Sequence, residues 1–170
     1  MDVAARARAV RLAIFDVDGV LTDGTIYMGP AGEAFKAFNI ADGHGVKMLQ
    51  AAGVAVAIIS GRSSEAVARR AEELAIAHLV QGSKDKFADF ERVIEGLGLG
   101  REACAFVGDD LPDLAVMRAC GFAVAVANAA DAVKAHAHYV TTASGGRGAV
   151  REFCELVLRA QGHLERAAAV

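Results

Sequence analysis

Acidic side chains follow two apolar runs of this sequence, and their spacing suits the binding of a divalent cation. Asp16 and Asp18 follow an apolar run over residues 10–15, and Asp109 comes just after a second run over residues 104–107. Because they lie two residues apart in an extended chain, the side chains of Asp16 and Asp18 are expected to point the same way. Their negative charges repel unless a proton or a cation binds between them. No histidine or cysteine accompanies these acids, so the candidate ligands are hard oxygen atoms, which favour Mg²⁺ over zinc.

Further polar side chains directly follow an apolar run or one of these acids. Ser60 follows an apolar run over residues 54–59, and Asp110 comes directly after Asp109. Capping of a helix is an alternative role for each, because Asp and Ser are preferred N-caps. Asp16 precedes no helical pattern, so capping does not account for it, and the set as a whole predicts a binding site.

The elements that must position these residues alternate along the chain. Runs typical of strands cover residues 10–15, 54–59, 77–80, 104–107, 122–126 and, as a short edge strand, 138–140. Between them, helical periodicity covers residues 45–52, 64–74, 86–97, 112–119 and 131–135. Strands that are apolar on both faces and separated by helices predict an α/β fold with a doubly wound parallel sheet. Ligands of such sheets bind outside the carboxyl ends of the strands, so the acids and Ser60 are expected to share one edge.

Residues 24–39 break this alternation. The sequence GPAG at residues 29–32 has the composition of a turn between two strand-like arms, which predicts a projecting β-hairpin. The residues expected on its apolar face are Ile26, Met28, Phe35 and Phe38. A two-stranded ribbon should not expose so much apolar surface, so another subunit is expected to cover it.

Length and composition limit the class of protein. The 170 residues predict one domain over 1–170, with a tail at 162–170 that frays or packs on a neighbour. Eighteen basic against 21 acidic residues give a net charge of -3, which disfavours nucleic acid as a partner. No apolar run reaches the ~18 residues of a membrane helix, and no export signal is expected. Three cysteines without metal-ligand spacing suggest a reduced, cytoplasmic protein.

Four short motifs carry a resemblance to a known family. DVDGVLT at residues 16–22 resembles the first motif of the haloacid dehalogenase superfamily of phosphatases, and IISGR at 58–62 is similar to the second. Lys86 fits the third motif, and GDDLPD at 108–113 fits the fourth. The match covers the chain in the expected order, and the first and fourth motifs are individually specific.

The resemblance implies a phosphatase that works through an aspartyl-phosphate. Asp16 is then the nucleophile, and Asp18 protonates the leaving alkoxide and later takes a proton from water. Mg²⁺ is expected on Asp16, Asp109 and the backbone carbonyl of Asp18. The groups expected to bind the phosphate are Ser60, Gly61 and Lys86. Asp110 is left as either an outer ligand through water or a helix N-cap, and Asp113 as a support of its loop.

The short insertions point to one branch of this superfamily. Only a hairpin follows the first motif, and only one helix and one strand separate Ser60 from Lys86, as in members that lack a cap domain. Within that branch the chain resembles the 3-deoxy-D-manno-octulosonate 8-phosphate phosphatases of lipopolysaccharide precursor synthesis. The stretches that carry this likeness are 22–24, 38–39, 42–45, 60–62 and 145–152. The likeness implies an acidic sugar phosphate as substrate and a homotetramer with hairpin contacts. Arg62 and Arg147 are then candidates for binding the substrate's anionic groups, and Lys36 is a weaker one.

Two alternatives stay open at this point. A phosphatase of nine-carbon sialic-type sugar acids has the same capless tetrameric plan. A receiver-type signalling domain also combines a parallel sheet, Mg²⁺, an acidic cluster and a lysine, although its phosphorylated aspartate ends the third strand.

Overall fold

A parallel sheet forms the centre of the structure, a computed structural model that describes residues 2–167. Its six strands run in the order β5-β4-β1-β6-β7-β8, and all neighbouring pairs are parallel. The strands are β1 (Leu12–Phe15), β4 (Ala55–Ile59), β5 (His78–Val80), β6 (Cys104–Gly108), β7 (Phe122–Ala125) and β8 (Tyr139–Val140). The predicted α/β fold with a parallel sheet is confirmed.

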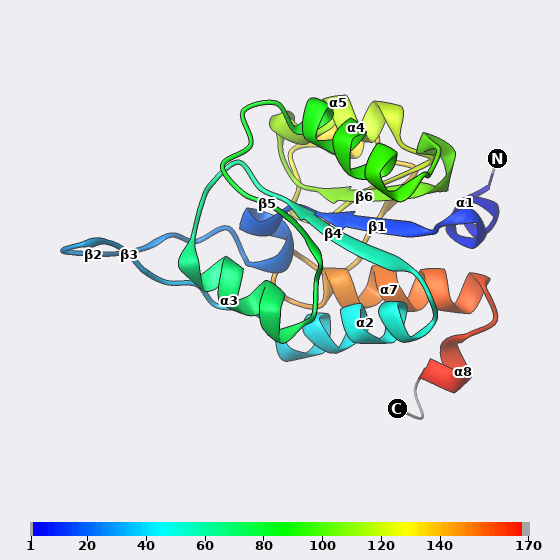
Figure 1. Ribbon diagram of the computed structural model, residues 1–170, viewed down its shortest axis with the longest axis horizontal. Coiled ribbons are helices and arrows are strands. Elements are labelled where there is room, and N and C mark those ends of the chain that lie inside the picture. The colour runs from blue at the N-terminus through cyan, green and yellow to red at the C-terminus, as the bar shows by residue number, and fades with distance from the viewer. Residues whose placement is uncertain (1, 168–170) are drawn as a thin grey trace.

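Helices cover both faces of this sheet (Figure 1). α4 and α5 lie over one face, and α2 packs against α7 on the other. The helices are α1 (Val3–Ala9), α2 (Ile40–Ala51), α3 (Glu65–Glu73), α4 (Lys86–Leu97), α5 (Leu114–Ala119), α6 (Asp131–Lys134), α7 (Ala149–Ala160) and α8 (Leu164–Ala167). Within residues 2–167 no helix has the length and apolar character needed to cross a membrane.

The structure can be compared with the sequence-based predictions at both ends of the chain. Helix α1 was not predicted from the sequence, because its residues VAARARA bury only Ala7 and show no apolar stripe. The tail at 162–170 was predicted to fray or pack on a neighbour. Residues 164–167 form α8, and the rest of that prediction lies outside the described residues.

The core is built by strands that are buried on both faces. Every residue of β1, β6 and β7 is buried. The ring of Phe153 on α7 lies 5.7 Å from that of Phe15 and 6.1 Å from that of Phe122, so this helix is held against the middle of the sheet. Burial on both faces explains why these strands are uninterrupted apolar runs in the sequence.

The register of the central strands brings their carboxyl ends to one edge. Phe15 at the end of β1 pairs with Ile58 of β4 and with Val107 of β6. Asp16, Ser60 and Asp109 therefore leave the sheet at nearly the same height. A short η1 turn (Val17–Leu21) follows β1, and another, η3 (Leu111–Asp113), follows β6.

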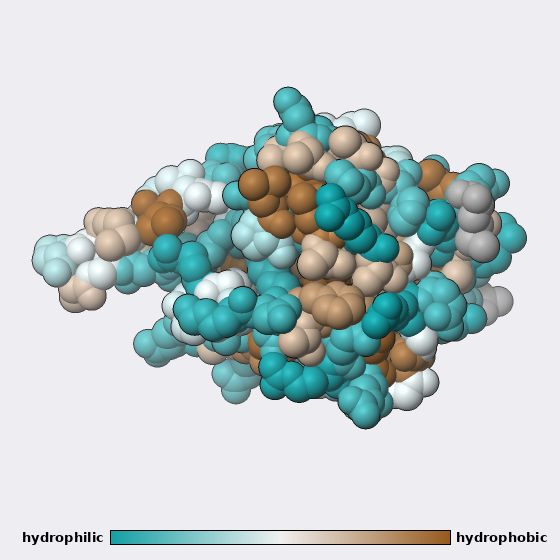
Figure 2. Space-filling model, turned by 90° about the horizontal axis from the view of Figure 1, so that it is seen from above, coloured by the Kyte–Doolittle hydropathy of each residue, from teal (hydrophilic) through white to brown (hydrophobic). Residues whose placement is uncertain are grey.

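The predicted hairpin is present and projects from the body of the protein (Figure 1). It consists of β2 (Tyr27–Gly29) and β3 (Gly32–Phe35), and the rings of Tyr27 and Phe35 stack with centroids 4.4 Å apart. Met28 is 69% exposed and Phe35 55% exposed, and Figure 2 shows hydrophobic side chains on this arm. The prediction was wrong for Phe38, which lies beyond β3 and packs against the core beneath the guanidinium of Arg70.

Candidate active site

A cavity of about 260 Å³ opens at the carboxyl edge of the sheet. Its lining comprises Asp16, Asp18, Ser60, Gly61, Arg62, Lys86, Asp109, Asp110, Pro112 and Asp113. The structure thus brings together the site residues proposed from the sequence, with the exception of Arg147 and of the weaker candidate Lys36. These residues come from the segments that follow β1, β4 and β6 and from the start of α4.

Asp16 lies buried at the end of β1. Its carboxylate accepts a hydrogen bond of 2.7 Å from the backbone N–H of Val17, so Asp16 caps the η1 turn. The expectation that capping plays no part was therefore wrong, because the turn is too short to show a helical pattern in the sequence. Burial and the nearby negative charge of Asp113 raise the pKa of Asp16 to about 6.

Asp109 reaches toward the loop that follows β1. A β-carbon at Gly19 would lie 2.0 Å from Oδ2 of Asp109, and Gly19 has a φ of +92°, which disfavours any other residue. Burial raises the pKa of Asp109 to about 7, with further contributions from Asp16, Asp113 and Asp110. The loop and the acid are therefore fitted to each other, and glycine is the residue that allows it.

Asp113 joins the loop of Asp109 to the lysine of α4. Its Oδ2 accepts from the backbone N–H groups of Asp109 at 3.0 Å and Asp110 at 3.3 Å, and its Oδ1 lies 2.7 Å from Nζ of Lys86. The side chain is fully buried. Because donors already occupy both oxygens, its place is that of a loop support, as the sequence analysis expected. Asp110 caps η3 by accepting from the N–H of Leu111, so the structure shows the second of its two predicted roles.

Lys86 places a charged amine on the floor of the cavity. It is 8% exposed, and its Nζ lies 3.0 Å from Oδ1 of Asp16 as well as against Asp113. Burial alone would lower the pKa of Lys86, but the two carboxylates outweigh it and raise that pKa above its ordinary value. Lys86 is therefore held protonated beside Asp16.

The acids of this cavity fit a divalent cation. One carboxylate oxygen from each of Asp16, Asp109 and Asp113 lies within 4.8 Å of the others. Burial and then the neighbouring carboxylates raise the pKa values of Asp16 and Asp109, and Lys86 offsets this rise only in part. An all-oxygen donor set with excess negative charge is the chemistry that Mg²⁺ requires.

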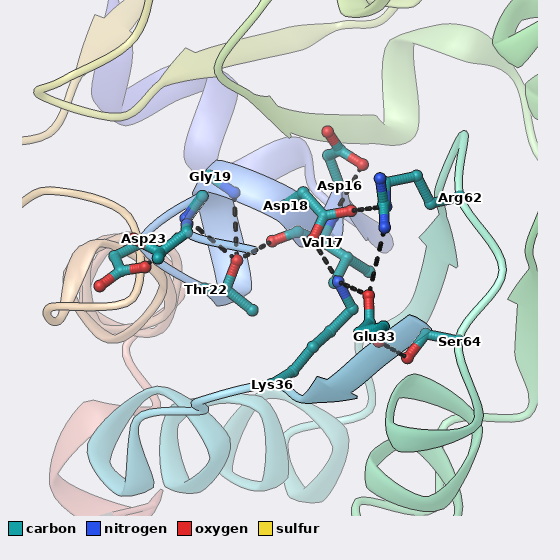
Figure 3. A network of polar contacts seen from close by, with 12 residues as sticks. Asp16, Val17, Asp18, Gly19, Thr22, Asp23, Glu33, Lys36, Arg62 and Ser64 are labelled. Atoms are coloured by element: carbon teal, nitrogen blue, oxygen red, sulfur yellow. Dashed lines mark hydrogen bonds and ion pairs between the residues drawn. The ribbon is translucent and has the colours of Figure 1, made fainter. Parts of the chain in front are cut away.

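Asp18 lines the same cavity as Asp16, and its carboxylate is paired with two basic side chains. Its carboxylate contacts Nζ of Lys36 at 2.5 Å and Nε of Arg62 at 3.7 Å, and it is not part of the cluster formed by Asp16 (Figure 3). The contact with Arg62 joins Asp18 to the segment that follows β4.

Arg147 lies outside the cavity. Its side chain is 72% exposed and pairs with Asp23 at 3.4 Å. The glycine loop around it has a different role, because the N–H of Gly146 donates to the carbonyl of Val20 at 2.9 Å. A β-carbon at Gly145 would lie 1.7 Å from the carbonyl oxygen of Gly19, so this loop packs directly on the η1 turn.

Glu33 of the hairpin was not among the site residues predicted from the sequence. Its carboxylate accepts from the hydroxyl of Ser64 at 2.5 Å and contacts Nζ of Lys36 at 3.0 Å and Nη2 of Arg62 at 3.4 Å. Charged residues three apart on an otherwise apolar arm were the available signal. Their docking against the site depends on tertiary structure, which no local pattern predicts.

Comparisons with known proteins agree with this geometry. A family model described as haloacid dehalogenase-like hydrolase matches residues 75–153. The chain is 49% identical over 166 residues to the 3-deoxy-D-manno-octulosonate 8-phosphate phosphatase KdsC of Escherichia coli, covering 98% of this chain and 88% of that protein. The crystal structure of the phosphatase of that name from Yersinia pestis matches with a TM-score of 0.95 at 49% identity, over 96% of this chain and 89% of the other. The Moraxella catarrhalis phosphatase, in complex with magnesium, phosphate and KDO, matches with a TM-score of 0.95 at 43% identity, over 98% and 95% of the two chains.

Proposed function

Because this chain belongs to the 3-deoxy-D-manno-octulosonate 8-phosphate phosphatase family of haloacid dehalogenase-like hydrolases, we propose that it hydrolyses that sugar-acid phosphate to the free sugar acid and phosphate. The observation that carries the proposal is the cavity at the carboxyl edge of the sheet. It holds a buried aspartate, a protonated lysine and a second acid with a raised pKa. Phosphoryl transfer depends mainly on such positioned charges.

Asp16 is the proposed nucleophile. One of its carboxylate oxygens forms a bond to phosphorus as the bond from phosphorus to the ester oxygen breaks. The carboxyl of Asp18 gives its proton to the departing ester oxygen, which leaves as the sugar hydroxyl. Water then attacks the aspartyl-phosphate and loses a proton to Asp18, so that phosphate is released and both acids return to their starting states.

Mg²⁺ is the proposed cofactor. The carboxylates of Asp16 and Asp109 and the backbone carbonyl of Asp18 are the groups that would hold it. When bound, the ion neutralises negative charge on the transferred phosphoryl group. Ser60, Gly61 and Lys86 are proposed to bind the phosphate oxygens, since all three line the cavity.

Arg62 is proposed to bind the sugar acid. It stands at the cavity wall, and its side chain is 47% exposed, so its guanidinium remains accessible to a second anionic group of the substrate. Its fork geometry suits a carboxylate. Arg147, the second candidate, lies outside this cavity and pairs with Asp23.

We further propose a homotetramer in which hairpins contact neighbouring subunits. Met28, Phe35 and Ile26 are exposed on the arm, and an apolar surface of this kind is stabilised by burial against another chain. A cytoplasmic location is also proposed. The three cysteines are free and buried, as a reducing compartment permits.

Release of inorganic phosphate tests the proposed substrate. The eight-carbon and the nine-carbon sugar-acid phosphates are compared at equal concentration with Mg²⁺ present. We expect kcat/KM to be at least tenfold higher for the eight-carbon compound. A higher kcat/KM for the nine-carbon compound would identify the protein as a phosphatase of sialic-type sugar acids. A single stoichiometric phosphorylation of the protein, without turnover, would identify it as a phosphoacceptor domain.

A further inference from the structure

The hairpin contributes a buried cation to the neighbourhood of the active site. The side chain of Lys36 is only 2% exposed, although Lys36 follows directly on the exposed Phe35. Its Nζ lies 2.5 Å from Oδ1 of Asp18 and 3.0 Å from a carboxylate oxygen of Glu33. A buried lysine is retained where its charge is paired, and here the pairing links the hairpin to the site.

Lys36 approaches Asp18 from outside the cavity. Asp18 and Arg62 line that cavity, whereas Lys36 lines a separate groove between β3 and the start of α3. In Figure 3 the amine of Lys36 reaches Asp18 from the side of the hairpin. Within the described residues, the side chain of Lys36 therefore exposes no surface that a substrate bound in the cavity could contact.

Glu33 fixes this lysine in place. It accepts from the hydroxyl of Ser64 and contacts both Lys36 and Arg62. The two acids and two cations alternate, because Asp18 and Glu33 each contact both Lys36 and Arg62 (Figure 3). The carboxylate of Asp18 is thus held by two charged contacts, of which the one to Lys36 is shorter by more than 1 Å.

We propose that Lys36 is a positioning residue, which holds the carboxyl of Asp18 toward the ester oxygen of the substrate. This inference rests on the proposed function, in which Asp18 gives its proton to that oxygen as the bond to phosphorus breaks. Without Lys36, Arg62 is the one cation of this set that remains for both Asp18 and Glu33, and the two carboxylates repel each other. A misplacement of about 1 Å costs on the order of 10²-fold in rate.

The dependence of the rate on the leaving group separates this role from a general structural one. An alkyl phosphate such as the sugar-acid phosphate needs a proton on its departing oxygen, whereas para-nitrophenyl phosphate releases a stable phenolate. We expect Lys36→Met to lower kcat for the sugar-acid phosphate by about 10²-fold while its KM changes by less than about threefold. The loss with para-nitrophenyl phosphate should be at least tenfold smaller, and Lys36→Arg should restore part of the lost kcat.

The controls distinguish the possible failures. Lys47→Met removes an exposed lysine of α2 and should leave both rates unchanged. Equal losses with the two substrates, or no loss with either, would overturn the role of Lys36 and leave the proposed function standing. If the wild-type protein released phosphate from neither substrate, the proposed function itself would fail, and the inference with it. Should Lys36→Met not fold, Lys36→Gln is judged by the same ratio of the two losses.

Discussion

The contact between Asp113 and Lys86 allows a quantitative prediction about stability. Both side chains are buried, and Nζ of Lys86 lies 2.7 Å from Oδ1 of Asp113. Asp113→Asn keeps the shape and one oxygen but turns an amide N–H₂ or a neutral oxygen toward the ammonium. Loss of one partner of a buried ion pair costs about 3–5 kcal/mol. Because Asp16 remains 3.0 Å from the same amine, we take the lower end, about 3 kcal/mol.

Thermal unfolding in buffer with EDTA measures this loss without any contribution from a bound cation. For a chain of this size, about 3 kcal/mol corresponds to a fall in Tm of roughly 6–12 °C. The matched control is Asp131→Asn, which removes an exposed acid paired with Lys134 at 3.9 Å and should leave Tm unchanged.

A double-mutant cycle tests whether the cause is the pair itself. Lys86→Met should also destabilise the protein, because it leaves the carboxylates of Asp16 and Asp113 without their cation. The double variant with Asp113→Asn should be more stable than the sum of the two losses by at least about 1 kcal/mol. Additive losses, or a fall in Tm of less than about 2 °C for Asp113→Asn, would refute the reasoning.

The remaining predictions concern the chemistry of the site. Asp16→Asn should abolish phosphate release while circular dichroism shows a folded protein, and retained turnover would remove Asp16 as nucleophile. EDTA should stop phosphate release and added Mg²⁺ should restore it, whereas indifference to chelation would contradict the metal site. Arg62→Met should raise KM for the sugar-acid phosphate roughly 10–100-fold, while Arg147→Met should change it by less than about twofold; equal effects would contradict the placement of Arg62. Without metal, Asp16 (pKa raised to about 6) and Asp109 (raised to about 7) bind protons more tightly in the folded protein than in the unfolded chain. The free energy of unfolding should therefore decrease as pH rises from about 4 to about 7, so that Tm in EDTA is lower at pH 8 than at pH 5, and a Tm that rises over this interval would contradict the assignment.

The sheet and most of the cavity could be predicted because they depend on local patterns. Strands such as β1 and β6 are buried on both faces and so appear as continuous apolar runs, and the topology then carries the residues after them to one edge. Lys86 could be predicted only from its place in the order of the four motifs, because no local pattern distinguishes it from a lysine on the surface.

The direction of individual side chains could not be predicted in the same way. Asp18 lines the cavity as expected, but its pairing with Lys36 and Arg62 joins segments that lie far apart in the chain. Glu33 reaches the site only because the hairpin docks against Ser64 and Arg62. Arg147 sits in a motif that resembles the family's, but the glycines of that motif make the contact with the η1 turn.

The packing of the glycine loop on the η1 turn also has a consequence for synthesis. Asp16, the proposed nucleophile, emerges early from the ribosome, whereas Gly145 and Gly146, which pack against the loop that follows it, belong to the last fifth of the chain. A nascent chain can form the first strands of the sheet, but it cannot complete the catalytic loop until translation is nearly finished. Premature termination before this segment therefore yields a product that contains Asp16 and lacks the glycine loop that packs on the η1 turn.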